Sequence, residues 1–461
     1  VNTMKSKPKK LGLFMLIALV CGNMIGSGVF LLPSSLAALG SISLWSWAVT
    51  GFGALILALL FAKMSILVPY SGGPFAYAYA AFGEFIGFQT AFNYWLALWI
   101  GNAAIAVAFV GYLQVFFPIL QSSLYSCTTA IALVWALTFF NLLGAHKAGV
   151  LQLITTILKL VPLLIVGLFG WFYFHPSYLT DYKNLTGHSN FSVISSGALL
   201  TLWAFIGLES ATVPAGEVEN PKRNIPLATI VGVLLTIFIY ISCSIAIMGM
   251  IKPSTLQYST APFADAAQII FGPLGKSLVA IGAIIACFGT LNGWILLQGQ
   301  ITKAAADRGQ FPAIFGKINR FNSNHWGQLF TSTLISVLLL MTANKGLINQ
   351  FNFTILLASI LSAVPYLYTA LATIITIKRS KTMVKNSSLY IIIAPLGVIY
   401  TLWAIFSAGQ EIVYYLMLSL TASPLLYTWS KSIKKLDAKT KNTLNLTINS
   451  TEFSAIEELS S

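Results

Sequence analysis

Long apolar stretches, separated by short polar segments, dominate the pattern of residues along this chain. A helix that crosses the hydrocarbon core of a bilayer needs about 20 predominantly apolar residues. Twelve stretches are about that long or longer, so the pattern predicts twelve membrane-spanning helices. The predicted spans are 12–39, 43–68, 84–117, 123–143, 148–174, 193–216, 225–251, 276–302, 327–343, 350–376, 388–408 and 412–430.

The basic residues gather in every second connecting segment, which indicates the cytoplasmic side of a membrane protein. With the N-terminus placed inside, few basic residues fall in outer loops: Lys183, Lys252, Lys276 and Lys345. This orientation puts both termini in the cytoplasm and requires an even number of crossings, as twelve provides. Residues 1–11 then form a cytoplasmic N-terminus. Residues 437–461 are polar without periodicity and are expected to be a disordered cytoplasmic tail.

Composition supports a membrane protein and excludes other classes. The chain is 57% hydrophobic and 8% charged, whereas soluble domains carry about 25% charged residues. A net charge of +14 could indicate nucleic-acid binding. However, the basic residues flank the spans, so the expected partner is the lipid bilayer and not a nucleic acid. The cysteines lie singly inside apolar runs, which predicts small buried hydrophobes and neither disulfides nor a metal site: Cys21, Cys127, Cys243 and Cys287.

Two of the spans carry small or ionisable residues at their centres. The first contains GNMIGSGVF over residues 22–30, and the sixth contains TLWAFIGLESA over residues 201–211. Close packing of helices through Gly22 and Gly26 is one interpretation of the first motif. The second motif also has a glycine at mid-span, Gly207, with the acidic Glu209 two residues after it. Together the two motifs favour an interruption of both helices. Unwound backbone at membrane depth must line a cavity or be buried in protein.

The first and sixth spans lie five apart, so two successive five-span units enter the membrane with opposite orientations. Interrupted segments at matching positions of two such halves indicate the binding site of a transporter. We therefore expect an all-α membrane protein with a first repeat at 12–174, an inverted second repeat at 193–376, and two further helices at 388–430. Half-helix N-termini attract a carboxylate, and free carbonyls accept from an ammonium. A zwitterionic amino acid presents both groups.

Four motifs in order resemble the amino acid–polyamine–organocation transporters: GNMIGSGVFLLP, TLWAFIGLESA, ENPKRNIP (219–226) and VPYLY (364–368). The resemblance covers residues 9–430. Within that superfamily, YWLALWIGN (94–102) is most similar to the bacterial arginine/agmatine antiporters, and the putrescine–ornithine exchangers are near relatives that lack it. The resemblance implies a LeuT-like fold, a multi-pass protein of the bacterial inner membrane, no cofactor, and a homodimer by analogy.

The resemblance also implies functional residues. Ser27 and the backbone at Gly26 and Gly28 would bind the substrate carboxylate, and Trp294 would stack on a guanidinium. A planar cation over a desolvated indole gains about 2 kcal/mol or more. The full substrate-binding set is Asn23, Met24, Gly26, Ser27, Gly28, Ala97, Asn102, Trp203, Ile206 and Trp294. In it, Asn102 and the Ala97 carbonyl would hydrogen-bond the guanidinium, while the carbonyls of Met24, Trp203 and Ile206 would receive the α-ammonium. Tyr94 and Tyr366 match gate positions.

The chain departs from the arginine/agmatine antiporters in ways that leave guanidinium specificity open. Apolar residues replace serine, cysteine, methionine and serine at Ala204, Leu98, Ile105 and Ala358. These replacements predict a pocket that is less polar around the distal group. Phe75 replaces a tyrosine that the resemblance links to the acid response.

Two charged residues lie deep inside predicted spans. Glu209 is a mid-membrane carboxylate, which is costly and a functional candidate by default. The resemblance makes it a residue that responds to acid without touching substrate. Lys159 lies too far from either end of its span for its stem to reach water easily. Many members of the superfamily have a lysine there, whose ammonium stands in for a coupling sodium and holds the broken first span. We predict a role for Lys159 in gating or proton coupling.

Three classes of function compete. An enzyme would need a catalytic constellation, but the histidines are scattered through loops and no pair of acids lies in the membrane: His146, His175, His188 and His325. A receptor would usually carry a larger soluble domain, so a carrier is favoured. The expected activity is alternating-access exchange of arginine for agmatine, which supports acid resistance because decarboxylation consumes a cytoplasmic proton. The alternative is a proton-coupled or exchanging permease for other amino acids or polyamines, such as ornithine and putrescine.

Overall fold

The computed structural model describes residues 11–69, 72–144, 154–321, 323–379 and 387–432. Within these ranges the chain is helical, with two isolated β-bridges and no strand. The longer helices are α1 (Leu13–Met24), α2 (Ser27–Ala37), α3 (Trp45–Leu67), α4 (Pro74–Phe82), α5 (Glu84–Leu113), α6 (Ser123–Leu142), α8 (Leu160–Phe169), α10 (Asn190–Leu202), α11 (Pro221–Met250), α13 (Pro262–Asp307), α14 (His325–Thr342), α15 (Leu347–Arg379) and α16 (Ser387–Phe406). The last helical segment is Gln410–Ser432. The short helical turns are Ser41–Leu44, Pro118–Gln121, Gly170–Tyr173, α9 (Ser177–Thr180), Trp203–Phe205, Ser210–Thr212, Ala215–Glu217, α12 (Pro253–Leu256), Ala313–Gly316 and Ala343–Lys345.

Twelve helical segments of the described chain are long and apolar enough to cross a membrane, which confirms the predicted number. The eighth differs most from the prediction. It begins at Pro262, before the expected 276, and continues to Asp307. Gly272 interrupts it with a φ of +68°, a conformation that glycine adopts without penalty, and Pro273 follows. The extra residues 262–271 form a separate arm, which the apolar pattern alone did not distinguish from a loop. The predicted tail and residues 1–10 lie outside the described residues.

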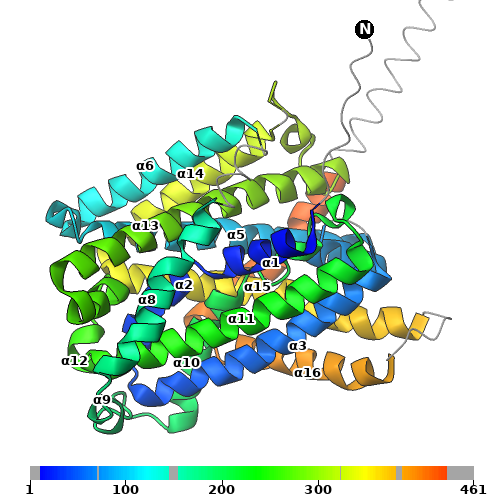
Figure 1. Cartoon of the computed structure of the whole chain (residues 1–461). Helices are drawn as coiled ribbons and strands as arrows, with labels where there is room; N and C mark the ends of the chain where they lie inside the picture. The colour runs from blue at the N-terminus through cyan, green and yellow to red at the C-terminus, as the bar shows by residue number, and fades with distance from the viewer. Residues whose placement is uncertain (1–10, 70–71, 145–153, 322, 380–386, 433–461) are drawn as a thin grey trace, which may run out of the picture.

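The first and sixth spans are both interrupted, as the motifs predicted. The first consists of α1 and α2, separated by extended backbone at Ile25 and Gly26. The sixth consists of α10 followed by short turns, with Gly207 at a φ of +111°. Figure 1 shows α1 and α2 between α6 and α14 on one side and α3, α10 and α16 on the other. The division into two five-span units remains a prediction.

The connecting segments gather at two opposite ends of the bundle. At the end that holds α9 and α12, Ser41 N donates to Tyr182 O at 3.0 Å and Ser123 Oγ donates to Ala343 O at 2.6 Å (Figure 1). At the other end, Lys431 pairs with Glu84 at 2.7 Å. We call these the outer and the inner end, following the orientation that the basic residues predict.

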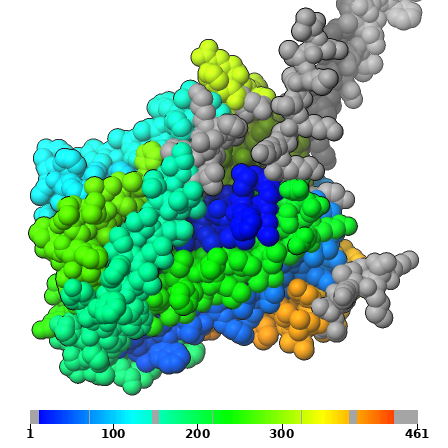
Figure 2. All heavy atoms as spheres, viewed as in Figure 1, coloured from blue at the N-terminus to red at the C-terminus, as the bar shows by residue number. Residues whose placement is uncertain are grey.

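Large apolar side chains are exposed around the bundle. Phe14 of α1 and Phe238 of α11 are 85% and 73% exposed, and Figure 2 shows α1 reaching the surface beside α11. A soluble protein rarely exposes such large contiguous apolar areas. The lipid bilayer is the environment that accommodates this surface, so the chain is a multi-pass integral membrane protein.

Candidate functional site

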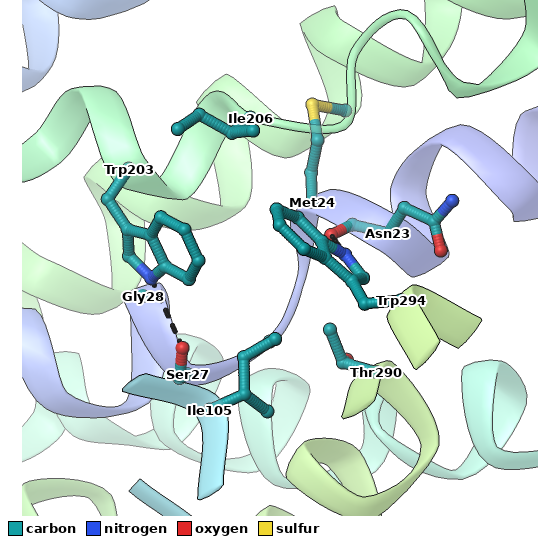
Figure 3. Close-up of a pocket in the computed structure, with 10 residues that line it drawn as sticks. Asn23, Met24, Ser27, Gly28, Ile105, Trp203, Ile206, Thr290 and Trp294 are labelled. Atoms are coloured by element: carbon teal, nitrogen blue, oxygen red, sulfur yellow. Dashed lines mark hydrogen bonds between the residues drawn. The ribbon is translucent and has the colours of Figure 1, made fainter. Parts of the chain in front are cut away.

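A small pocket lies between the two interrupted spans. Its cavity volume is about 10 Å³, which is room for roughly one water molecule. The lining residues come from α1, α2, α5, α13 and the sixth span: Asn23, Met24, Gly26, Ser27, Gly28, Ile105, Trp203, Ile206, Thr290 and Trp294 (Figure 3). Eight of the ten proposed substrate-binding residues therefore come together here. None of the ten lining side chains is charged, so the backbone dipoles and the indole faces determine the electrostatics of the pocket.

Two tryptophans form the walls of this pocket. The rings of Trp203 and Trp294 have centroids 5.3 Å apart and planes inclined at 53°. Trp203 Nε1 donates to Ser27 Oγ at 3.1 Å, as Figure 3 shows. Because Ser27 Oγ accepts this bond, its own hydrogen stays available to donate to a carboxylate. An added Cβ at Gly101 would lie 2.5 Å from the Trp203 ring, so the glycine lets α5 approach the indoles closely.

Glycines also allow the two interrupted spans to pack together. An added Cβ at Gly28 would lie 2.9 Å from Ala204, and one at Gly207 would lie 3.2 Å from Asn23. No side chain caps the N-terminus of α2, and the first N–H groups of a helix have no partners within the helix. These N–H groups and the positive end of the helix dipole favour an anion at Ser27.

Tyr240 of α11 connects the two interruptions and was missed by the sequence analysis. Its fully buried Oη lies 2.6 Å from the Met24 carbonyl oxygen and 3.0 Å from that of Ala204. A hydroxyl carries one hydrogen, so it can donate to one of these carbonyls at a time. The Met24 carbonyl was expected to accept a hydrogen bond from the α-ammonium of the substrate. The Tyr240 hydroxyl already lies within hydrogen-bond distance of it, but the carbonyl oxygen has a second lone pair that can accept another donor. The only feature of the sequence that could have indicated this role is the position of a tyrosine at the centre of an apolar span.

Lys159 lies against the interruption of the first span. Its Nζ donates to the Gly22 carbonyl, to the Ile25 carbonyl at 2.8 Å, and to Thr290 Oγ1 at 3.1 Å. The side chain is fully buried, and the ion pairs of the described chain do not include it. Carbonyls that lose their helical partners at the break thus surround the ammonium. This geometry fits the predicted holding of the first span, while the role in transport remains a prediction.

Glu209 forms a cluster with the two gate tyrosines. Tyr94 Oη donates to Oε1 at 2.6 Å, and Tyr366 Oη donates to Oε2 at 2.8 Å. The N–H of Gly207 also lies 3.3 Å from Oε2. These three groups satisfy the fully buried carboxylate and connect α5, α15 and the sixth span. Glu209 does not belong to the pocket lining, and its role in the response to acid stays a prediction.

We expect Glu209→Gln to lower the rate of exchange on the order of 10-fold and to flatten its dependence on pH. The carboxamide of glutamine has one oxygen, so its NH₂ end cannot accept the hydrogen bond from the second tyrosine hydroxyl. A hydrogen bond to a charged group contributes about 1.5–3 kcal/mol, and the variant loses one. Exchange rates in proteoliposomes between pH 5 and 8 provide the measurement. The matched control is Glu411→Gln, because Glu411 is exposed. A wild-type pH profile in Glu209→Gln would rule out a gating role.

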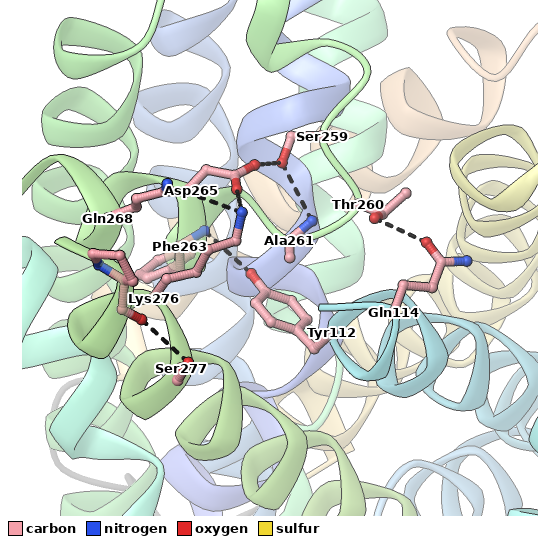
Figure 4. Close-up of polar contacts among 11 residues, drawn as sticks. Tyr112, Gln114, Ser259, Thr260, Ala261, Phe263, Asp265, Gln268, Lys276 and Ser277 are labelled. Atoms are coloured by element: carbon pink, nitrogen blue, oxygen red, sulfur yellow. Dashed lines mark hydrogen bonds and ion pairs between the residues drawn. The ribbon is translucent and has the colours of Figure 1, made fainter. Parts of the chain in front are cut away.

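The arm at 262–271 contacts α5 at the outer end of the bundle. The Tyr112 hydroxyl donates to the Phe30 carbonyl of α2 at 2.6 Å and accepts from the Phe263 N–H at 3.3 Å. Asp265 pairs with Lys276 at 3.0 Å beyond the break at Gly272. Figure 4 shows the contact of Tyr112 with Phe263 and the pairing of Asp265 with Lys276. The second half of the first span is thereby tied to the outer arm, a connection that the sequence did not predict.

Two of the proposed substrate-binding residues lie outside the pocket. Ala97 and Asn102 are buried in α5, but neither belongs to the lining. Asn102 Nδ2 donates to Gln298 Oε1 of α13 at 2.6 Å, a partner that the sequence analysis did not identify. Within the described ranges, no three His, Cys, Asp or Glu side chains gather in a group that could hold a metal ion.

An interrupted pair of spans around a pocket, inside a bundle of twelve membrane helices, defines the class of membrane transporters with broken helices. Comparison with known sequences then gives the family. The sequence model of the amino acid permease family matches residues 11–430. The chain belongs to this family.

The chain is also similar to three characterised transporters. It is 37% identical over 368 residues to the cadaverine/lysine antiporter of Escherichia coli (strain K12), covering 79% of this chain and 83% of that protein. It is 35% identical over 412 residues to the putrescine transporter PotE of the same strain, with 89% and 94% covered. The PotE protein of Haemophilus influenzae is 34% identical over 413 residues, with 89% and 95% covered. The resemblance to amino acid and polyamine transporters is confirmed.

Proposed function

We propose that this chain is an antiporter that exchanges a basic amino acid with a terminal ammonium for the corresponding diamine. Lysine with cadaverine, or ornithine with putrescine, are the pairs it would carry by alternating access. The names of the similar transporters support amines of this kind, and thus the alternative from the sequence rather than arginine and agmatine. The protein would lie in the bacterial inner membrane with both termini in the cytoplasm.

The observation that carries this proposal is the uncharged pocket between the two interruptions. The α2 N-terminus at Ser27 would hold the carboxylate, and carbonyls of the unwound segments would hold the α-ammonium. The indole of Trp294 would stabilise the distal cation by a cation–π interaction. A diamine lacks the carboxylate but keeps both ammonium groups, so it could occupy the same carbonyls and indole.

Exchange of an amino acid for its decarboxylated amine also explains how such a carrier would serve the cell. Decarboxylation in the cytoplasm consumes a proton, so export of the amine and import of the amino acid remove acid indirectly. The antiporter itself then needs no resident cofactor and no proton path through the pocket. Its two substrates differ by one carboxylate, and therefore by one unit of charge.

Counterflow in proteoliposomes tests the proposed function. Vesicles preloaded with unlabelled lysine should accumulate labelled lysine, and external cadaverine, ornithine or putrescine should compete. We expect arginine and agmatine to compete about 10-fold less well, because the pocket offers apolar Ile105 and Ile206 near the indoles and no polar fork for a guanidinium. Stronger competition by arginine and agmatine would restore the arginine/agmatine interpretation. Counterflow with none of these amines would refute basic amino acid exchange altogether.

A further inference from the structure

A groove opens between α8 and the first part of α13, and it shares no residue with the pocket between the interrupted spans. Its cavity volume is about 270 Å³. Six residues line it, and none of them has a polar side chain: Ile165 of α8, and Phe271, Leu274, Gly275, Leu278 and Val279 of α13. An apolar cavity of about 150 Å³ already holds a molecule the size of benzene. This groove therefore has room for a longer apolar group.

The groove lies between two points at which α8 and α13 come together. On its inner side, an added Cβ at Gly282 would lie 2.9 Å from Pro162, so the two helices pack closely there. On its outer side, the rings of Phe169 and Phe271 have centroids 5.5 Å apart. Between these points, Gly275 has no side chain that could fill the space. The groove is thus bounded at both ends along the two helices.

The open side of the groove faces the bilayer. Leu274 and Leu278 at its rim are 71% and 57% exposed, and they continue the apolar surface that surrounds the bundle. Ile165 precedes Tyr173, the outer end of this span, by eight residues, which corresponds to a depth of about 12 Å. At that depth lipid tails, and not water, surround the protein.

We propose that an acyl chain of a phospholipid from the outer leaflet occupies this groove and sets the spacing between α8 and α13. The hydrophobic effect contributes little to this binding, because lipid tails are as apolar as the groove. The stabilisation comes from packing, since an unfilled void of this size would leave the atoms of its lining without contacts. A linear chain that enters from the side supplies those contacts.

The groove and Lys159 lie on opposite sides of the close contact between Pro162 and Gly282. Lys159 precedes Pro162 by three residues, and its Nζ donates to Thr290 Oγ1 of α13 at 3.1 Å. The same two helices therefore form both the groove and the contact beside the first interruption. Because close-packed interiors transmit strain, the spacing at the groove affects the contact of Lys159 with Thr290. This inference goes beyond the proposed function, since it connects the first interruption to the bilayer.

Photolabelling in proteoliposomes tests the lipid site without relying on transport. The probe is phosphatidylcholine with a photoreactive diazirine in the middle of one acyl chain, and mass spectrometry locates the label. We expect label on residues 271–279 and on the α8 segment around Ile165. Ile165→Trp, which fills the groove from α8, should lose most of the label on α13. Leu164→Trp is the matched control and should keep it, because Leu164 is 53% exposed and does not line the groove.

Exchange in two kinds of vesicle tests the link to Lys159. Methyl-branched acyl chains are too wide for the groove, so the wild type and Leu164→Trp should exchange lysine more slowly in vesicles of branched lipid than in vesicles of linear lipid. In Ile165→Trp the indole replaces the lipid tail, and the rate should be the same in both vesicles. Should Ile165→Trp not reach the membrane, Leu278→Phe fills the groove from α13 and must behave in the same way.

The outcomes separate the lipid site from its effect and from the proposed function. Label spread evenly over all lipid-facing spans, or unchanged in Ile165→Trp, would overturn the site. Cross-links between two copies of the chain at this groove, with none to lipid, would show that a second copy covers it and would also overturn the site. Loss of label in Ile165→Trp with an unchanged response to branched lipid would refute the link to Lys159. If the wild type exchanges no amine, the proposed function fails while the labelling still decides the lipid site.

Discussion

Lys159→Met is expected to lower the rate of exchange about 100-fold, because two hydrogen bonds from a charged group to backbone carbonyls are lost at about 1.5 kcal/mol or more each. The methionine keeps the length of the stem but cannot donate to the Gly22 and Ile25 carbonyls. Thr290 can still donate to Ile25, so Gly22 is the carbonyl left without a partner. The interrupted first span would then no longer be held in the geometry that forms the pocket. Exchange rates in proteoliposomes over a range of pH provide the measurement.

Lys63→Met is the matched control for this prediction. Lys63 is also buried in a spanning helix, but its ammonium lies over the Tyr390 ring at 4.9 Å, away from the interruptions. We expect this variant to exchange at close to the wild-type rate. An unchanged rate and pH profile in Lys159→Met would refute the role of Lys159 in gating or proton coupling. Equal losses in both variants would indicate that any buried lysine of these spans matters only for folding.

Trp294→Ala is expected to weaken the apparent affinity for lysine about 30-fold, which corresponds to about 2 kcal/mol of cation–π stabilisation. The indole lines the pocket, and its Nε1 donates to the Asn23 carbonyl at 3.3 Å, which fixes the orientation of the ring. Trp294→Phe keeps an aromatic face and should recover part of the loss. Competition with unlabelled lysine in counterflow measures the change.

The control for this second prediction is Trp429→Ala, which removes an indole that is 58% exposed. We expect no change in affinity there. Norleucine separates a cation–π effect from a change in pocket shape, because it lacks the distal charge. If Trp294→Ala weakened norleucine as much as lysine, the indole would act as a wall of the pocket and not as a cation-binding face.

The arrangement of Glu209 shows what a sequence motif conveys and what it omits. Its position in the middle of a span identified Glu209 as a candidate functional residue, because a carboxylate inside the membrane is costly. Tyr94 and Tyr366 were each assigned to gate positions by resemblance. Only the folded structure shows that both tyrosines donate to the same carboxylate, because these residues come from three spans far apart in the sequence.

For other contacts of the site, the sequence did not identify the partner. Tyr240 lies in an apolar stretch of α11, and nothing in that stretch indicates that its hydroxyl reaches carbonyls of both interrupted spans. Likewise, Asn102 was expected to bind a guanidinium, whereas the structure places it outside the pocket lining and in contact with Gln298. The partner of a buried polar group depends on the rotation and depth of neighbouring helices, which a single sequence does not report.

The sequence by itself determined the number of spans and the interruption of the first and sixth. These features follow from local chemistry: lipid demands long apolar helices, and a centre rich in glycine weakens a helix wherever it is packed. Tertiary structure decided which side chains meet at the interruptions. The ammonium of Lys159, the Glu209 cluster and the Asn102–Gln298 pair all form between separate spans, because a buried polar group must take its partner from whichever helix packs against it.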